Sequence, residues 1–160
     1  MFKSNVELGD GHYWVNEPGL SIDIPLRFVG DENNASNVVV ELSGTISWSG
    51  KAGWVEGVTF RRPKVSSGEG SKDDMLRIVD GGRIDMVHSV LDNSGSTGAS
   101  SIVVQGSGSG GRWENVIISG GNDQGVALDG GAKIELKKVR TCDCSPLDLD
   151  QVCFSSAGSE

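Results

Sequence analysis

Two aspartates, Asp80 and Asp129, are the first residues whose type and setting could carry chemistry, because each precedes a pair of glycines, and Asp85 and Asp92 lie nearby. Carboxylates that share a cleft supply the acid and the base of glycoside hydrolysis. At matching corners two repeats apart they would be roughly 10 Å from each other, at or beyond the limit for that reaction. An aspartate before two glycines also closes a turn. We therefore expect turns here and no enzyme, with Asp80 and Asp129 as the catalytic pair only if the chain cleaves glycosides.

A basic cluster, Arg61, Arg62 and Lys64, offers a different chemistry. Guanidinium groups bind carboxylate and phosphate groups through parallel hydrogen bonds, so adjacent arginines in an acidic protein are a candidate docking point. The alternative is a solvated loop flank that balances nearby acids. The polar stretch 64–74 follows directly, and such insertions on repeat proteins often form binding elements.

Tryptophans are the third group of candidates. Trp54 and Trp113 follow glycine-rich stretches, and exposed indoles there could anchor a protein partner or stack on a sugar ring. Trp48 alternates in phase with the apolar residues before it, which predicts a place in the core. We expect Trp14 to cap the N-terminal end of the fold.

Metal and cofactor sites are not expected. The cysteine count is odd, there is no Cys-x-x-Cys pair, and the histidines are far from the cysteines, so the ligands are too few. This cysteine usage favours a reduced location inside the cell, in the cytoplasm or nucleus. The residues concerned are Cys142, Cys144, Cys153, His12 and His88.

Charge and hydropathy exclude two classes of partner. The formal net charge is −8, so phosphate backbones and anionic membranes would be repelled. No apolar run approaches the 18 residues that a membrane-spanning helix needs. The partner that remains is another protein or a carbohydrate.

Short apolar strands separated by glycine-rich corners recur along the chain. Ile102 follows Leu76 by 26 residues, and Val126 follows Ile102 by 24. A period in the mid-twenties fits one coil of a parallel β-helix, and it is too short for ankyrin or tetratricopeptide repeats. The four copies are 45–60, 75–86, 101–118 and 125–136.

The sequence thus predicts an all-β protein, a short right-handed parallel β-helix of about five coils. We assign 1–144 to this domain and 145–160 to a C-terminal cap or loosely attached tail. Each end of the stack leaves strand edges that must be capped, paired or continued. The expected inward residues are Ile24, Leu26, Phe28, Ile46, Trp48, Val58, Phe60, Leu76, Ile78, Ile84, Met86, Ile102, Val104, Val116, Ile118, Val126, Leu128, Ile134 and Leu136.

The N-terminal stretch also carries a family resemblance. "GDGHYWVNEPGLSIDIPLRFVGD" (9–31) and "VVVELSGTISWSGKAGWVEGVTF" (38–60) resemble the opening coils of the β-helix region in the F-box β-helix proteins and in the SHC-SH2-domain-binding protein. The likeness covers about residues 9–140 and implies a right-handed β-helix of the pectin lyase-like kind that recognises proteins. No leucine-rich helical segment of the F-box type precedes residue 9, so this chain alone does not indicate a ligase-adaptor role.

These observations favour a protein-interaction module, for example substrate recognition within a larger assembly such as a ubiquitin ligase. The expected binding residues are Trp54, Arg61, Arg62, Lys64 and Trp113. One alternative is a carbohydrate-binding or glycoside-cleaving domain, and another is a structural unit that associates with itself through its open ends.

Overall fold

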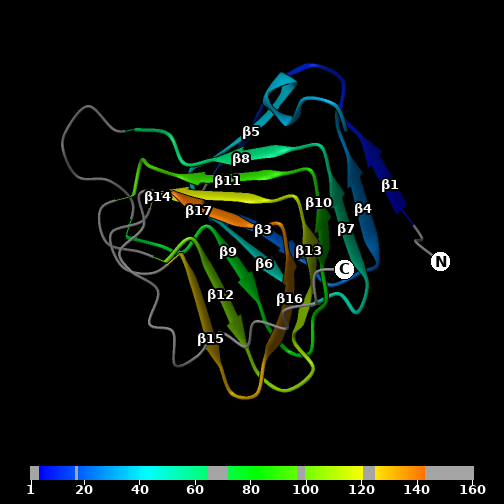
Figure 1. Ribbon diagram of the computed structural model, residues 1–160, viewed down its shortest axis with the longest axis vertical. Helices are drawn as coiled ribbons and strands as arrows, with labels where there is room; N and C mark the ends of the chain where they lie inside the picture. The colour runs from blue at the N-terminus through cyan, green and yellow to red at the C-terminus, as the bar shows by residue number, and fades with distance from the viewer. Residues whose placement is uncertain (1–3, 17, 65–71, 97–99, 121–124, 143–160) are drawn as a thin grey trace, which may run out of the picture.

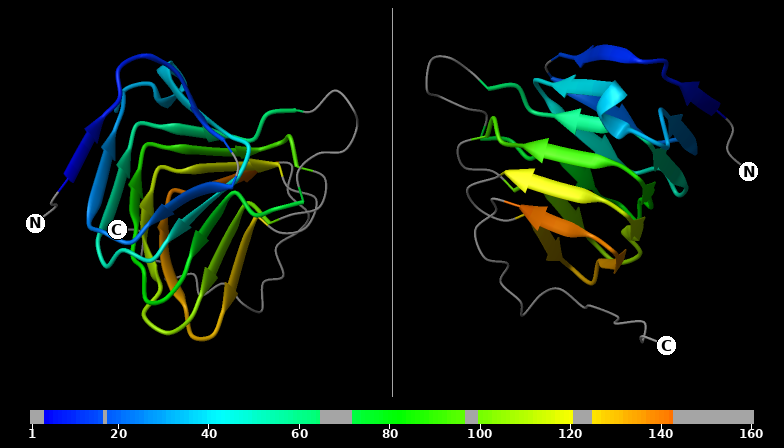
Figure 2. Two further views of the ribbon diagram at one scale, coloured as in Figure 1. Left: turned by 180° about the vertical axis from the view of Figure 1, so that it is seen from behind. Right: turned by 45° about the horizontal axis from the view of Figure 1, so that its top comes forward.

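Three parallel sheets, called A, B and C here, wind around one core (Figures 1 and 2). The computed structural model describes residues 4–16, 18–64, 72–96, 100–120 and 125–142, and the expected tail at 145–160 lies outside them. The chain passes from A to B to C and then returns to A, always pairing with the preceding coil. The fold is a right-handed parallel β-solenoid of about five coils, which confirms the repeat analysis.

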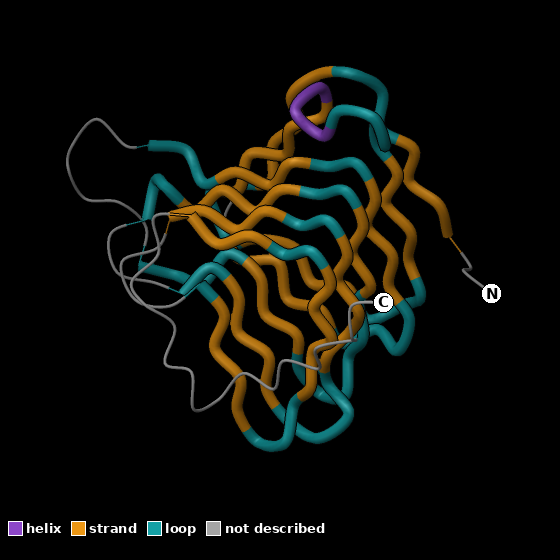
Figure 3. Tube along the Cα trace, viewed as in Figure 1, coloured by secondary structure: helices purple, strands orange, loops and turns teal. Residues whose placement is uncertain are grey.

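Each sheet is a stack of short strands (Figure 3). Sheet A contains β1 (Ser4–Glu7), β4 (Leu26–Val29), β7 (Gly53–Glu56), β10 (Asp85–Val87), β13 (Gly110–Glu114) and β16 (Lys133–Lys137). Sheet B contains β2 (Gly11–Val15), β5 (Val38–Leu42), β8 (Thr59–Arg61), β11 (Val90–Asn93), β14 (Ile117–Gly120) and β17 (Arg140–Cys142). Sheet C contains β3 (Gly19–Ile22), β6 (Thr45–Trp48), β9 (Leu76–Ile78), β12 (Ile102–Gln105) and β15 (Val126–Asp129). A short 3-10 turn, η1 (Ala35–Asn37), lies between β4 and β5.

Register stacks equivalent residues of successive coils. In sheet C, Ile46 pairs with Leu76, Leu76 with Ile102, and Ile102 with Val126. Side chains in a strand alternate between the two faces, so an in-register parallel stack turns each sequence position into a column. One set of columns fills the core, and the other lies on the outer surface.

The core confirms most of the predicted inward residues. Leu26, Phe28, Leu128 and Leu136 are only partly buried but pack against it. Ile24 is a correction, because it lies in the turn before β4 and its side chain is 47% exposed. The other predicted residues are buried: Ile46, Trp48, Val58, Phe60, Leu76, Ile78, Ile84, Met86, Ile102, Val104, Val116, Ile118, Val126 and Ile134.

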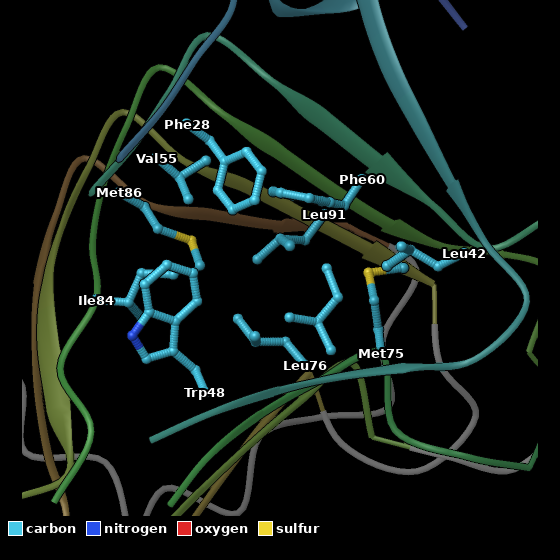
Figure 4. Close-up of a pocket in the computed structure, with 11 residues that line it drawn as sticks. Phe28, Leu42, Trp48, Val55, Phe60, Met75, Leu76, Ile84, Met86 and Leu91 are labelled. Atoms are coloured by element: carbon cyan, nitrogen blue, oxygen red, sulfur yellow. The ribbon is translucent and has the colours of Figure 1, made fainter. Parts of the chain in front are cut away.

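Packing in the middle of the core is close to complete (Figure 4). Phe28 and Trp48 meet edge to face, with ring centroids 6.4 Å apart and planes inclined by 64°. A cavity of about 10 Å³ remains among apolar side chains that include Leu76 and Met86. That volume is at the lower limit for a single water molecule, so the cavity is a packing gap and not a ligand site.

The corner between sheets C and A depends on glycine. Asp80 and Gly81 have φ of 55° and 72°, the pair of positive values that a tight type I′ turn requires. After the corner, Gly111 lies so close to the preceding coil that a Cβ would be 1.8 Å from the carbonyl oxygen of Ile84. The glycine content thus serves both to turn the chain and to let coils approach.

The corner between sheets A and B repeats one backbone conformation. Gly57, His88, Asn115 and Lys138 follow β7, β10, β13 and β16, and all have φ between 50° and 65°. The His88 Nε2 and Asn115 Nδ2 atoms lie 3.1 Å apart, so the amide donates to the ring nitrogen when that nitrogen is unprotonated. Glycine and asparagine tolerate this region of φ, whereas a lysine is strained there.

Within the described ranges, no helix is both long enough and apolar enough to cross a membrane. The same ranges hold no group of three or more histidine, cysteine, aspartate or glutamate side chains that could bind a metal ion. Cys144 and Cys153 lie outside the described residues.

Candidate functional site

Five polar or aromatic residues form a single column on the outer face of sheet B. Trp14 pairs with Glu41, Glu41 with Arg61, Arg61 with Asp92, and Asp92 with Ser119. The column therefore collects one residue from each of β2, β5, β8, β11 and β14, and residues far apart in sequence meet on one surface. We call this set the outer column of sheet B.

Arg61 holds the centre of the outer column. Its Nη1 atom lies 3.8 Å from Glu41 Oε1, and its Nε donates to Asp92 Oδ2 at 3.3 Å. The other oxygen of Asp92 accepts hydrogen bonds from the Ser94 amide at 3.1 Å and from the Ser119 hydroxyl at 3.4 Å. Arg61 thus bridges two carboxylates that come from β5 and β11, the strands on either side of β8.

Glu41 is the unusual member of this set. Its side chain is 8% exposed, and the Oε2 atom is buried with no hydrogen-bond partner. The other oxygen lies 3.8 Å from Arg61 Nη1 and 3.8 Å from His12 Nδ1. A buried carboxylate oxygen without a donor is unfavourable in a folded protein, so Glu41 has hydrogen-bonding capacity that the described residues leave unused.

The loop at 31–37 borders the outer column. Ala35 accepts a hydrogen bond from the Thr59 hydroxyl on β8 at 2.9 Å, which ties η1 to sheet B. The carboxylate of Asp31 accepts from the Asn33 amide at 2.9 Å and from Asn37 Nδ2 at 2.8 Å. The Asn33 amide, together with the Asn37 side chain and the Asn34 amide, lowers the pKa of Asp31, because each stabilises the charged form.

Arg62 is not part of any accessible basic cluster, contrary to the sequence prediction. It follows β8 and points inward, where it is 2% exposed. Its Nη1 donates to the carbonyl oxygens of Leu42, Ser43 and Gly44 at 2.9–3.3 Å. Its Nη2 donates to the carbonyls of Asp73 and Asp74 at 3.1 and 3.0 Å. The guanidinium joins two corners of the backbone and cannot dock a partner.

The remaining members of the predicted basic cluster differ in setting. Lys64 is exposed at the end of the described segment, and most of the polar stretch 64–74 lies outside the described residues. Arg61 is 38% exposed and paired with two acids. Of the three basic residues, Arg61 is therefore the one that contributes to a defined surface.

The two tryptophans predicted as binding residues also differ in exposure. Trp113 is completely buried, and its Nε1 donates to the Ile84 carbonyl at 3.0 Å, so its assignment as a binding residue is wrong. It belongs to the inward column of sheet A, where Met86 and Leu136 are its neighbours. Trp54 is partly exposed on the outer face of the same sheet.

Trp54 sits in a polar setting. It lies between Arg27 and Asp85 in register, and its Nε1 donates to Glu56 Oε2 at 2.9 Å. The same oxygen accepts from Arg27 Nη2 at 3.2 Å. Glu56 therefore fixes both the indole and the guanidinium, and part of the Trp54 ring faces solvent.

Asp80 and Asp129 do not occupy matching positions in their coils, contrary to the sequence prediction. Val104 pairs with Ile78 on one side and Leu128 on the other, so Asp129 comes one residue after this column and Asp80 two residues after it. Asp80 lies in the turn, whereas Asp129 ends β15 and accepts from Gln105 Nε2 at 3.4 Å. The catalytic alternative that rested on a matched pair has no geometric support.

The first coil, residues 4–25, holds three of the four exposed large hydrophobic residues among those described. Trp14, Leu20 and Ile24 belong to it, and Ile117 is the remaining large hydrophobic residue that is exposed among those described. Trp14 is 64% exposed on the outer face of β2, so it does not cap the end of the stack. Figure 2 shows this coil in blue at one end of the solenoid.

No family model, curated protein or solved structure matches the chain.

The outer column was missed in the sequence because its members fall in unlike contexts. Glu41 sits in the apolar run "VVVEL", and Trp14 follows a tyrosine. Counting the strand alternation outward from Phe60, which pairs with Val40 and Leu91, would have placed Glu41, Arg61 and Asp92 side by side.

Proposed function

We propose that this β-solenoid is a protein-interaction module and that its binding surface is the first coil with the adjoining part of the outer column of sheet B. The observation that carries the proposal is Trp14, which is 64% exposed and neighbours Glu41 on β5. Tryptophan and arginine are the residues most enriched at binding hot spots, and Trp14 and Arg61 flank Glu41 in this column.

Apolar exposure at the first coil supports the same surface. Large hydrophobic side chains gathered at one place, rimmed by polar groups, are typical of protein-binding sites. Recognition within a larger assembly, such as a ubiquitin ligase, is the form of this proposal that the resemblance to F-box β-helix proteins suggests. The odd cysteine count favours an intracellular setting for it.

The test is affinity capture from a cell extract with the whole chain as bait, using matched tryptophan variants. We expect a protein that is retained by the wild type and by Trp54→Ala and is lost with Trp14→Ala. Thermal unfolding of both variants controls for folding. Equal recovery of all proteins by the wild type and Trp14→Ala would contradict the proposed surface.

A carbohydrate-binding function is the second candidate, and Trp54 is the observation that favours it. Its partly exposed ring lies between Arg27 and Asp85 on the outer face of sheet A, a setting in which an indole could stack on a sugar. Titration with oligosaccharides should then change the fluorescence of the wild type and not that of Trp54→Phe. An unchanged signal across neutral and acidic sugars would remove this candidate.

A further inference from the structure

We infer that the exposed edge of β2 accepts a basic β-strand from the partner, which extends sheet B by one strand. This inference rests on the proposed function and names the chemistry of the partner. Strand addition to an open sheet edge is a common mode of peptide recognition, in which main-chain hydrogen bonds supply affinity and alternate side chains supply specificity.

β2 leaves one of its edges open at the end of sheet B. β1, β2 and β3 each stand at the end of their sheet, so each has a hydrogen-bonded neighbour strand on one side among the described residues. β2 is the longest of the three, with five residues from Gly11 to Val15. Edge strands present a row of unpaired amide and carbonyl groups, and β2 is the best of these templates.

Partly exposed apolar side chains of the first coil form a floor beside that edge. Leu20 pairs with Ile46 in an inward column, yet it is 37% exposed because no described coil lies above it. Leu8, Tyr13 and Val15 pack on the core but are only partly buried. A strand added to β2 would place every second side chain over this floor, so those side chains should be apolar.

Charge indicates what the other side chains are. Residues 4–25 contain four acids, Glu7, Asp10, Glu17 and Asp23, and no lysine or arginine, which gives −4. The last described coil, 126–142, contains four lysines and arginines and two acids, Asp129 and Glu135, which gives +2. The acidic field of the first coil favours a basic partner and speeds its association.

Trp14 and Glu41 give the basic side chain a defined place. They are neighbours on the outer face, and an added strand would lie beyond Trp14, about 4.8 Å from β2 and about 9.6 Å from β5. A lysine or arginine there can lie across the indole, where cations bind favourably, and direct its charge toward Glu41. Glu41, whose buried Oε2 atom has no donor among the described residues, is the carboxylate whose charge such a cation would complement.

Two copies of this chain are a less favourable occupant. Joining two first coils would oppose −4 with −4, and like charges at an interface are unfavourable. Association of the first coil with the last coil of another copy has complementary charge, so the experiment must separate it from binding of a basic strand.

The experiment titrates the isotopically labelled whole chain with a blocked peptide of alternating lysine and valine, followed by amide NMR shifts. We expect saturable shifts centred on Gly11–Val15 and weaker binding at high salt. Trp14→Ala should weaken binding at least about tenfold, whereas Trp54→Ala should leave it unchanged. Matched controls are a glutamate–valine peptide and the lysine–valine peptide with a central proline, which cannot pair along the edge.

The outcomes separate the two proposals. If the lysine–valine peptide leaves β2 unshifted while Trp14-dependent protein capture persists, the basic strand is wrong and the interaction function stands. Equal binding of the glutamate peptide, or shifts that map to sheet A, would also overturn it. Concentration-dependent broadening of β2 without peptide, with a dimer mass by light scattering, would assign the edge to a second copy. Loss of both capture and peptide binding removes both proposals.

Discussion

Arg61 and Arg62 are adjacent in the chain, but their side chains lie on opposite sides of sheet B. Arg61 joins two carboxylates on the outer face, and Arg62 is buried against five backbone carbonyls. The alternation of a β-strand continues one residue past β8, and it alone decides which arginine reaches solvent. One arginine therefore belongs to the candidate surface and the other to the scaffold.

Arg62→Met should strongly destabilise the fold. The methionine fills part of the volume but removes the guanidinium from five carbonyl groups, of which Asp74 still accepts from the Thr45 hydroxyl at 2.7 Å. The cost is about 1–3 kcal/mol for each group that is left without a donor and that water cannot reach. Arg62→Lys should rescue little, because an ammonium group on a flexible stem cannot span both corners. Urea unfolding measures the change. Arg61→Met, which removes a 38% exposed guanidinium with partners at 3.3 and 3.8 Å, should cost clearly less than Arg62→Met. A similar loss for both variants would contradict the distinction.

Much of the fold was predictable because equivalent residues of successive coils recur at a nearly constant spacing in the sequence. Leu76, Ile102 and Val126 recur at intervals of 26 and 24 residues, and the structure stacks them in register. The sequence predictions were wrong where a shift of one residue decides the position of a side chain. Examples are Arg62, which points inward, and the offset of one residue between Asp80 and Asp129. A corner can gain or lose a residue without changing the strands on either side, so corner positions do not follow from the repeat period.

The site was less predictable than the fold for a related reason. Trp113 follows a glycine-rich stretch, as an exposed loop residue would, but it belongs to β13 and pairs with Met86 in the core. The preceding glycines, Gly110 and Gly111, are strand residues that permit close approach between coils. Composition alone does not distinguish a glycine that turns the chain from one that packs a strand.

That distinction gives a prediction for two glycines. In Gly111→Ala the new Cβ would lie 1.8 Å from the Ile84 carbonyl oxygen, so the two coils must separate, and we expect a loss of at least about 3 kcal/mol. Gly131 has φ of 80°, but the space that an added Cβ would occupy has no other atom within 4 Å, so Gly131→Ala should cost only the left-handed strain, about 1–2 kcal/mol. Chemical denaturation compares the two, and equal losses would show that turn conformation rather than coil spacing sets the requirement.

Substitution by glycine should change the stability of the protein in opposite directions at two adjacent lysines. Lys138 has φ of 53°, so Lys138→Gly relieves left-handed strain and should stabilise the protein by about 0.5–1 kcal/mol. Lys137 lies in β16 and its Nζ is 2.7 Å from Glu114 Oε1, so Lys137→Gly should destabilise by about 1 kcal/mol. The shift of the thermal midpoint reports each change. Destabilisation by Lys138→Gly would mean that its side chain contributes more than its backbone conformation costs.

Asp31 makes the loop beside the outer column sensitive to acid. Hydrogen bonds from the Asn33 amide, the Asn37 side chain and the Asn34 amide lower its pKa below the ordinary value of 3.8. A carboxylate whose folded pKa is depressed stabilises the protein above its unfolded pKa, and this contribution is lost as pH falls through the folded pKa. We therefore expect the loop 31–37 to stay anchored at pH 5 and to loosen in the range below 3.8, which hydrogen exchange of the Asn33 and Asn34 amides would follow. Asp31→Asn keeps the shape and removes the charge, so its exchange should be faster at pH 5 and lose the acid-dependent step. An NMR titration of Asp31 with a midpoint at or above 3.8 would show that these hydrogen bonds do not hold the loop in the charged form.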